Sequence, residues 1–364
     1  MKNRVLAFLI MALLSMFLAG GCSDKEDKVA EETISRIDFP SELHKTYGEY
    51  VKADARILVP DAIKGEKIHK VKAALIDMDV ELIKNKTEEY TQNQFEQFQI
   101  LEQKDYQGIT VYDHEYVDKE DGGFSITYSE NQNSILYFPK DMTFVLSAFR
   151  LANDPDYNGD LFLNGEEFSF ASRQDAFLNI KKYLEEIGVK IGEDYRCYYL
   201  DYETMEQEEK KYDADAGLGK KVWSESDNAY YFAINQEVES IPVYVPLFGI
   251  YNEDIDYNAP IQIMYKASGI GFIQTGNLYE TEETEEYVNV IDIGEIFNSI
   301  NEKYSMLISE EVVTVTQMKL CWIPNHDSDE LILAWSIRGA LSSGTEVQMF
   351  YDAQTGKELI GVSL

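Results

Sequence analysis

The stretch SRQDAFLNIKKYLEEIG, from Ser172 to Gly188, predicts an amphipathic helix with well-marked ends. Ser172 is a favoured residue at a helix start, and Asp175 places a negative charge near the positive end of the helix dipole. Gly188 is typical of the position just after a helix. The apolar residues recur at helical spacing and form one face, which consists of Phe177, Ile180, Leu184 and Ile187. This helix therefore needs an apolar surface to pack against.

Segments with strand patterns surround this helix. Upstream, GFSITYSENQNSILYF (123–138) alternates apolar and polar residues on both sides of the turn-forming SENQN, which predicts a hairpin. Downstream, further strand-like segments are EDYRCYYLDY, AYYFAINQEVESIPVYV and APIQIMYKASGIGFI. A second helix, IDIGEIFNSINEKY, precedes three more strands, VVTVTQMKLCWIP, ELILAWSIRGA and TEVQMFYDA. Helices that interrupt runs of consecutive strands favour an α+β fold with antiparallel sheets and packed helices.

The length of 364 residues predicts one large or two ordinary domains. We predict an N-terminal α+β domain over residues 36–165 and a C-terminal α+β domain over residues 166–364. Each strong helix is followed by strands, which hints at a distant internal duplication.

The N-terminus has the features of an export signal. Lys2 and Arg4 precede an uncharged, mostly apolar run that ends in small residues before a cysteine, in the stretch LAGGCSD. This arrangement resembles the lipobox of bacterial lipoproteins. The resemblance implies that residues 1–21 are a lipoprotein signal peptide and that Cys22 carries a diacylglyceryl anchor.

Residues 22–35 are charged and poor in aromatic residues, so we interpret them as a flexible tether. The expected location is the extracytoplasmic face of the cell membrane, with acyl chains on Cys22 as the anchor. An uncleaved membrane anchor and plain secretion are the alternatives.

The net charge is strongly negative. The chain has 66 acidic and 32 basic residues, for a formal charge of −34. Such a surface repels phosphate backbones, which excludes nucleic acid as a partner. Acidic clusters such as ETEETEEY (280–287) are interpreted as solvated loops.

Two cysteines remain besides Cys22. Cys197 and Cys321 both lie in strand-like segments. They could pair outside the cytoplasm, but we favour two buried free thiols, because unpaired cysteine commonly behaves as a small apolar residue.

The C-terminal end resembles that of PepSY domains. The shared features are a strand with Trp335, a following hairpin, and a turn that places Asp352, Thr355 and Gly356. A longer resemblance, from Ser172 to the end, is to YycI-type regulatory proteins of low-GC Gram-positive bacteria and to uncharacterised clostridial lipoproteins. It implies interaction rather than catalysis, with a membrane sensor or a peptidase as partner.

One segment could bind calcium. DPDYNGD places Asp154, Asp156, Asn158 and Asp160 at alternate positions, with Gly159 at the bend, as in an EF-type loop. The position of the expected bidentate glutamate is occupied by a glycine. The alternative, which we favour, is a turn rich in Asp, Asn and Gly.

No local pattern predicts catalytic residues. The sequence lacks GxSxG, Walker and GxGxxG motifs. Its four histidines are scattered: His44 and His69 lie in ordinary charged surroundings, and His114 and His326 lie beside acids. We therefore predict no catalytic site and no cofactor other than the possible calcium.

The sequence favours a non-enzymatic interaction, sensing or regulatory module at the membrane surface. A PepSY-like peptidase inhibitor and a solute-binding lipoprotein are the alternatives.

Overall fold

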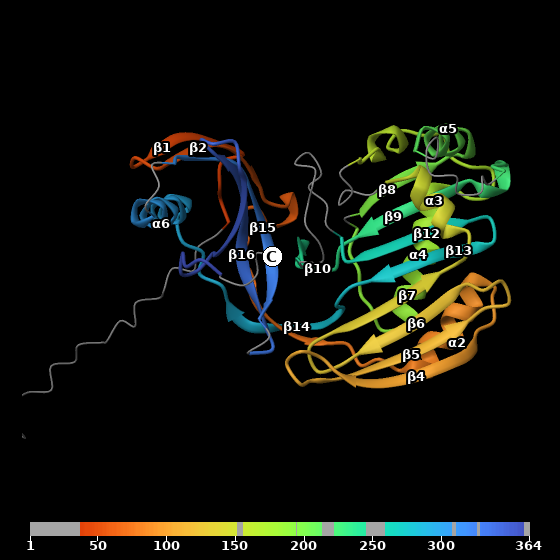
Figure 1. The fold of residues 1–364 in the computed structure, drawn as a ribbon. Coiled ribbons are helices and arrows are strands. Elements are labelled where there is room, and N and C mark those ends of the chain that lie inside the picture. The colour runs from red at the N-terminus through yellow and green to blue at the C-terminus, as the bar shows by residue number, and fades with distance from the viewer. Residues whose placement is uncertain are drawn as a thin grey trace, which may run out of the picture. The chain divides into compact units, whose positions relative to one another are not determined.

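Two large β-sheets, of seven and eight strands, organise the residues that the structure describes (Figure 1). The structure is a computed structural model, and it describes residues 37–150, 156–193, 195–212, 222–244, 259–307, 311–325 and 328–359. The fold is α+β, as predicted from the sequence.

The seven-stranded sheet has the order β1-β2-β15-β16-β3-β14, with β17 also paired to β16. Its strands are β1 (Glu42–Tyr47), β2 (Val51–Leu58), β3 (His69–Leu75), β14 (Tyr279–Tyr287), β15 (Val313–Asn325), β16 (Glu330–Leu341) and β17 (Glu346–Asp352). Its neighbouring strands pair antiparallel, except β2 and β15, which pair in parallel.

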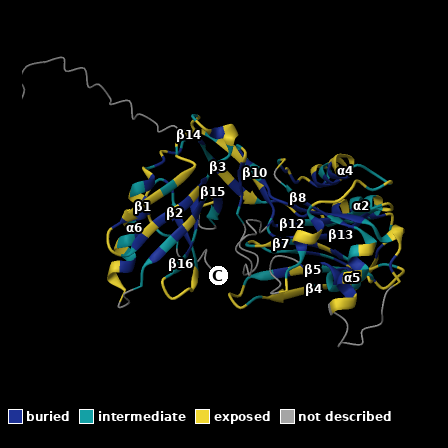
Figure 2. Ribbon diagram, turned by 90° about the horizontal axis from the view of Figure 1, so that it is seen from above, coloured by how far each residue is buried: buried dark blue, intermediate teal, exposed yellow. Residues whose placement is uncertain are grey.

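One face of this sheet packs against helix α6 (Ile293–Met306). Ile296, Phe297 and Ile300 of the helix share an apolar core with Val51 and Trp335 of the strands. Along β2, buried residues alternate with exposed ones, which Figure 2 shows as alternating dark blue and yellow bands. This period of two means that the other face of β2 is open to solvent.

The eight-stranded sheet is antiparallel throughout, in the order β4-β5-β6-β7-β13-β12-β9-β8. Its strands are β4 (Glu96–Lys104), β5 (Thr110–Val117), β6 (Gly123–Tyr128), β7 (Asn133–Phe138), β8 (Tyr195–Leu200), β9 (Ala229–Ile234), β12 (Ile261–Lys266) and β13 (Gly269–Thr275). Helices α2 (Val80–Thr91) and α4 (Arg173–Glu186) share one core with it. Ser172 caps α4 by accepting a hydrogen bond from the Asp175 amide, as predicted.

The opposite face of this sheet is also covered, over β8, β9, β12 and β13. A second core there contains residues of α3 (Met142–Ala148) and α5 (Tyr202–Tyr212). Short 3-10 helices are η1 (Asp61–Ile63), η2 (Gly159–Phe162) and η3 (Glu225–Asp227).

The eight-stranded sheet contains the same topology twice. Helix α2 is followed by the meander β4–β7, and helix α4 by the meander β8, β9, β12 and β13. The two meanders join through β7 and β13, and the strand order runs in opposite directions from that junction. This repeat begins with α2 and α4, whereas the duplication suggested by the sequence began with α4 and α6.

The sheets divide the chain differently from the predicted domains 36–165 and 166–364. The seven-stranded sheet takes strands from residues 42–75 and 279–352, and the eight-stranded sheet from residues 96–138 and 195–275. Each sheet thus combines strands from both sides of residue 165. The cause is long-range pairing, of β3 with β14 and of β7 with β13, which a local pattern cannot reveal.

The acidic segment ETEETEEY is not a loop. It forms most of β14, and the loop prediction was wrong because the neighbouring strand β3 supplies lysines. Glu282 lies opposite Lys72, and Glu286 forms an ion pair with Lys70 at 2.6 Å. Opposite charges across a strand pair stabilise it, which allows an acidic strand at the sheet edge.

The two cysteines are buried free thiols, as predicted. Cys197 lies in β8 of one sheet and Cys321 in β15 of the other. Burial raises the pKa of each thiol to about 12. The C-terminal turn also has its predicted geometry, because Asp352 Oδ1 accepts from the Gln354 amide at 2.7 Å and Gly356 has φ 65°.

Candidate functional site

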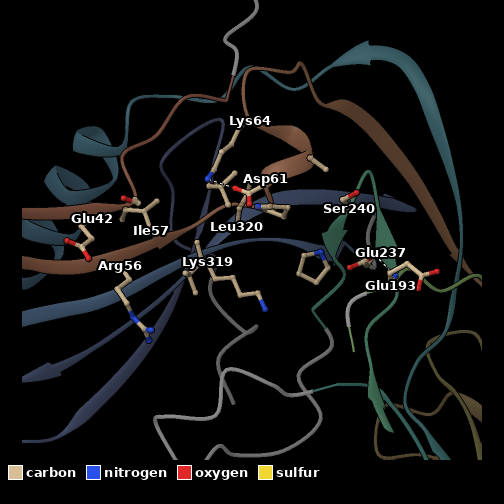
Figure 3. Close-up of a pocket in the computed structure, with 16 residues that line it drawn as sticks. Glu42, Arg56, Ile57, Asp61, Lys64, Glu193, Glu237, Ser240, Lys319 and Leu320 are labelled. Atoms are coloured by element: carbon tan, nitrogen blue, oxygen red, sulfur yellow. Dashed lines mark hydrogen bonds and ion pairs between the residues drawn. The ribbon is translucent and has the colours of Figure 1, made fainter. Parts of the chain in front are cut away.

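A groove opens where strand β15 changes its neighbour. On one edge, β15 pairs in parallel with β2 as far as Lys319, opposite Leu58. Strand β2 then ends, and the next residue paired on this edge is Val243, which bridges to Trp322. Between these two pairings lies a groove of about 740 Å³ (Figure 3).

The hairpin of β10 (Glu237–Val238) and β11 (Ile241–Pro242) borders the groove on the side away from β2. Two hydrogen bonds dock this hairpin onto β15. The Trp322 indole Nε1 donates to the Val238 carbonyl at 3.1 Å, and the Tyr244 amide donates to the Trp322 carbonyl at 2.8 Å. The position of this border therefore depends on Trp322.

Charged residues line both sides of the groove. Arg56, Lys319 and Glu42 lie on the side of the sheet, whereas Glu193 and Glu237 lie across the groove, near Ser240 (Figure 3). The guanidinium of Arg56 donates to Gln317 Oε1 at 3.1 Å, and Glu237 Oε2 accepts from the Glu193 amide at 3.3 Å. The sheet side thus carries charges of both signs, and the other side carries two carboxylates.

An ion pair lies at one end of the groove. Lys64 Nζ lies 2.6 Å from Asp61 Oδ1, in the turn that follows β2. The hydrogen bond from Lys64 lowers the pKa of Asp61. Both side chains are largely exposed, so the pair contributes little to stability and can rearrange around a ligand.

Two polar residues of the lining, Ser41 and Glu42, lie at β1. The apolar part of the lining consists of Ile57, Leu58, Val59, Pro60, Ala62, Pro242 and Leu320. Apolar lining with a few placed charges is the composition of ligand-binding sites, because apolar contact provides affinity and the charges set orientation.

A row of polar residues continues from the groove across the open face of the sheet. The residues paired across five neighbouring strands are Glu42, Arg56, Gln317, Arg338 and Gln348. Paired residues project to the same face, so this row places two guanidinium groups, two amides and the Glu42 carboxylate on one face, with Gln317 buried.

The described part of the DPDYNGD segment is organised by an arginine. Arg150 donates from Nε to the Asp156 carbonyl at 2.7 Å, and its amide donates to Asn158 Oδ1 at 2.8 Å. The Asn158 amide group donates to the Ala148 carbonyl at 2.8 Å. The side chain of Asn158 is therefore occupied within the protein, which argues against its being a calcium ligand.

Asp160 lies apart from this network. It begins the 3-10 helix η2 with Gly159, and its Oδ1 accepts from the Tyr157 hydroxyl at 3.2 Å. The calcium loop and the turn both stay predictions for Asp156, Asn158 and Asp160. Asp154, the first of the four candidate ligands, lies outside the described residues.

Other predicted features also lie outside the described residues, namely the signal peptide 1–21, Cys22, the tether 22–35 and His326. In the part of the chain that is described, no helix is long and apolar enough to cross a membrane.

Sequence reasoning did not identify the groove. Its charged residues come from five separate segments, around residues 42, 56–64, 193, 237 and 319, and none forms a local motif. Pro60 and Pro242, which both line the groove, were the sequence signal for it, because proline interrupts strand pairing and so marks where a strand loses its neighbour.

Comparison with known proteins yields a structural likeness without a function. No family model matches the sequence, and no curated protein matches it. The fold is similar to that of an uncharacterized protein from Eubacterium rectale ATCC 33656, known from a crystal structure, with a TM-score of 0.56 and 18% sequence identity. The match covers 88% of this chain and 93% of the other. At this identity the likeness concerns the fold alone.

Proposed function

We propose that this chain is a lipid-anchored, extracytoplasmic, non-enzymatic module that binds a partner at the cell membrane and senses or regulates it. The observation that carries this proposal is the groove between β2 and β11, which is lined by charged residues of both signs and by apolar residues. This composition favours recognition of a polypeptide segment, which offers apolar side chains, charges and backbone carbonyls together.

The N-terminal sequence supports the proposed location. An acylated Cys22 would hold the acidic body at the membrane while the body itself is repelled by anionic headgroups. Because the acyl anchor holds the body near the membrane and the headgroups repel it, the groove would be accessible to a protein partner rather than covered by lipid.

The resemblance of residues 172–364 to YycI-type regulators and PepSY modules supports a membrane sensor or a peptidase as partner. The hairpin that carries this resemblance, with Trp335 in β16 and Asp352 in β17, belongs to the same sheet as the groove. Partner binding in the groove would thus use the part of the chain that resembles these modules.

A solute-binding lipoprotein is the second candidate. The groove volume of about 740 Å³ lies within the range of small-molecule sites, roughly 300–1,000 Å³. A small ligand would raise the melting temperature of the purified protein, whereas a membrane-protein partner would be absent from that assay.

The test is in-cell photo-crosslinking from the rim of the groove. A photoreactive amino acid replaces Glu42, which is exposed, and captured proteins are identified by mass spectrometry. We expect one membrane sensor or peptidase to be captured, and we expect the yield to fall when Cys22→Ala removes the anchor. Absence of any capture above background at this position would contradict the proposal.

A further inference from the structure

The turn between β10 and β11 consists of two residues with different surroundings. Ser240 lines the groove, whereas the side chain of Glu239 contacts His69, the first residue of β3. Both turn residues have positive φ, 51° and 62°, which is uncommon for residues other than glycine. The turn therefore holds the Glu239 carboxylate in a fixed position over β3.

Both carboxylate oxygens of Glu239 contact His69. Oε1 lies 2.6 Å from the imidazole Nδ1, and Oε2 accepts from the His69 amide at 3.0 Å. The side chains of Glu239 and His69 are 15% and 31% exposed, so the contact is partly shielded from solvent.

A second carboxylate reaches the same place from β14. One ligand atom each from His69, Glu239 and Glu283 lie within 4.8 Å of one another. The pairing of β14 with β3 is irregular at this point. Glu283 pairs with Val71 and Tyr287 with His69, so β14 advances by four residues where β3 advances by two, which is a β-bulge in β14. Bulges of this kind bend a strand and redirect its side chains.

The charge of this cluster is not balanced within the described residues. Neither Glu239 nor Glu283 forms an ion pair with a lysine or arginine there, whereas Glu286 of the same strand pairs with Lys70. Two carboxylates this close repel each other. A divalent cation would balance both charges at once.

We propose that His69, Glu239 and Glu283 form a binding site for a divalent transition-metal cation, and that the cation is zinc. An imidazole nitrogen with two carboxylate oxygens suits zinc, whereas calcium and magnesium prefer oxygen ligands alone. Zinc binds such ligands at about 2.0–2.2 Å, with water able to fill the fourth position. Glu283 is exposed, so its side chain is free to close onto the ion.

Zinc at this position would join three elements that are far apart in the chain. It would fasten the β10–β11 hairpin to β3 and β14, and this hairpin borders the groove. That consequence for the groove rests on the proposed function, whereas the metal site itself does not.

The test is calorimetric titration of zinc chloride into the full-length chain, purified in detergent micelles and stripped of metal with a chelator. We expect one zinc per chain and at least tenfold weaker binding for Glu283→Gln. The matched control is Glu280→Gln, an exposed glutamate of the same strand, which should leave the affinity unchanged. Circular dichroism checks that both variants are folded.

X-ray absorption at the zinc edge provides a second readout. We expect one imidazole in the coordination shell, and its loss in His69→Gln. Absence of zinc binding by the wild-type chain, equal affinity in Glu283→Gln, or displacement of zinc by equimolar calcium would each overturn the proposal. Failure of the groove to bind a partner would leave these outcomes unchanged.

Discussion

Strands β9 and β2 show how differently the two sheets are used. All six residues of β9 are buried, because α2 and α4 pack on one side of its sheet and α3 and α5 on the other. In β2, buried residues alternate with exposed ones, because one face of the strand packs into the core that contains α6. A strand that is covered on both faces contributes to stability through burial, whereas a strand that is covered on one face has a second face exposed for recognition.

The largest expected effects come from substitutions that disrupt the apolar core on either face of β9. Tyr231 and Phe232 project to opposite sides of the strand and are fully buried. Replacement of either by alanine should lower the free energy of unfolding by about 3–5 kcal/mol. Arg56→Ala on the open face of β2 should cost less than about 1 kcal/mol. Urea unfolding measures all three, and a Tyr231→Ala variant as stable as Arg56→Ala would contradict two-sided burial.

The next effect concerns the polar network beside the covered face of the eight-stranded sheet. Glu208 is buried and lies 3.3 Å from Arg150, while Lys211 and Asn158 also bond to it. Glu208→Gln removes one charge of a buried pair and should cost about 1–3 kcal/mol at neutral pH. The matched control is Glu206→Gln on the same helix, where the carboxylate is more exposed.

This cost should depend on pH. Burial alone would raise the pKa of Glu208, but hydrogen bonds from Lys211 and Asn158 and the charges of Lys211 and Arg150 outweigh it and lower the pKa. A lowered pKa contributes stability above the unfolded-state value near 4.5, and this stability is lost as the pH falls through the folded-state value. The difference in unfolding free energy between wild type and Glu208→Gln should therefore shrink as the pH falls below about 4.5, and a constant difference would contradict the assigned network.

A smaller effect should appear in the groove. Arg56→Glu reverses one charge on the sheet side, so capture of a partner from position 42 should fall by about tenfold, which corresponds to about 1.4 kcal/mol. Lys52→Glu makes the same change on the same strand but outside the groove, and should leave capture unchanged. Equal losses in both variants would indicate general electrostatic attraction rather than binding in the groove.

The smallest expected effect is in thiol labelling, where we expect almost no reaction of the folded chain. Cys197 and Cys321 lie in different sheets, are buried, and have pKa values raised to about 12, so almost no thiolate forms at neutral pH. A maleimide probe should react with neither until denaturant is added. Rapid labelling of Cys321 alone would show that the open face of its sheet is more mobile than its burial indicates.

Local structure could be predicted where it depends on neighbouring residues. Helix α4 begins after Ser172, and the hairpin of β6 and β7 occupies residues 123–138, as the capping residue and the alternation indicated. The turn at Glu239 and Ser240 could not be predicted, because neither residue type favours positive φ. Helix α5 was not predicted, because it directly follows a segment with a strand pattern.

The candidate site could not be predicted because it is a product of long-range pairing. Arg56 and Lys319 meet through a parallel pairing across more than half the chain, and His69 meets Glu239 through the docking of a short hairpin. In the sequence, His69 is one histidine among lysines. Only the fold gives it two carboxylate neighbours.

The most direct test of the central claim compares two edge strands. Glu42 on β1 and Glu102 on β4 are both exposed glutamates, one at the groove and the other on the edge of the eight-stranded sheet. With the same photoreactive amino acid at each position, our account predicts capture of one membrane protein from position 42 and none from position 102. Equal capture from both positions, or capture from position 102 alone, would contradict the assignment of the groove as the recognition surface.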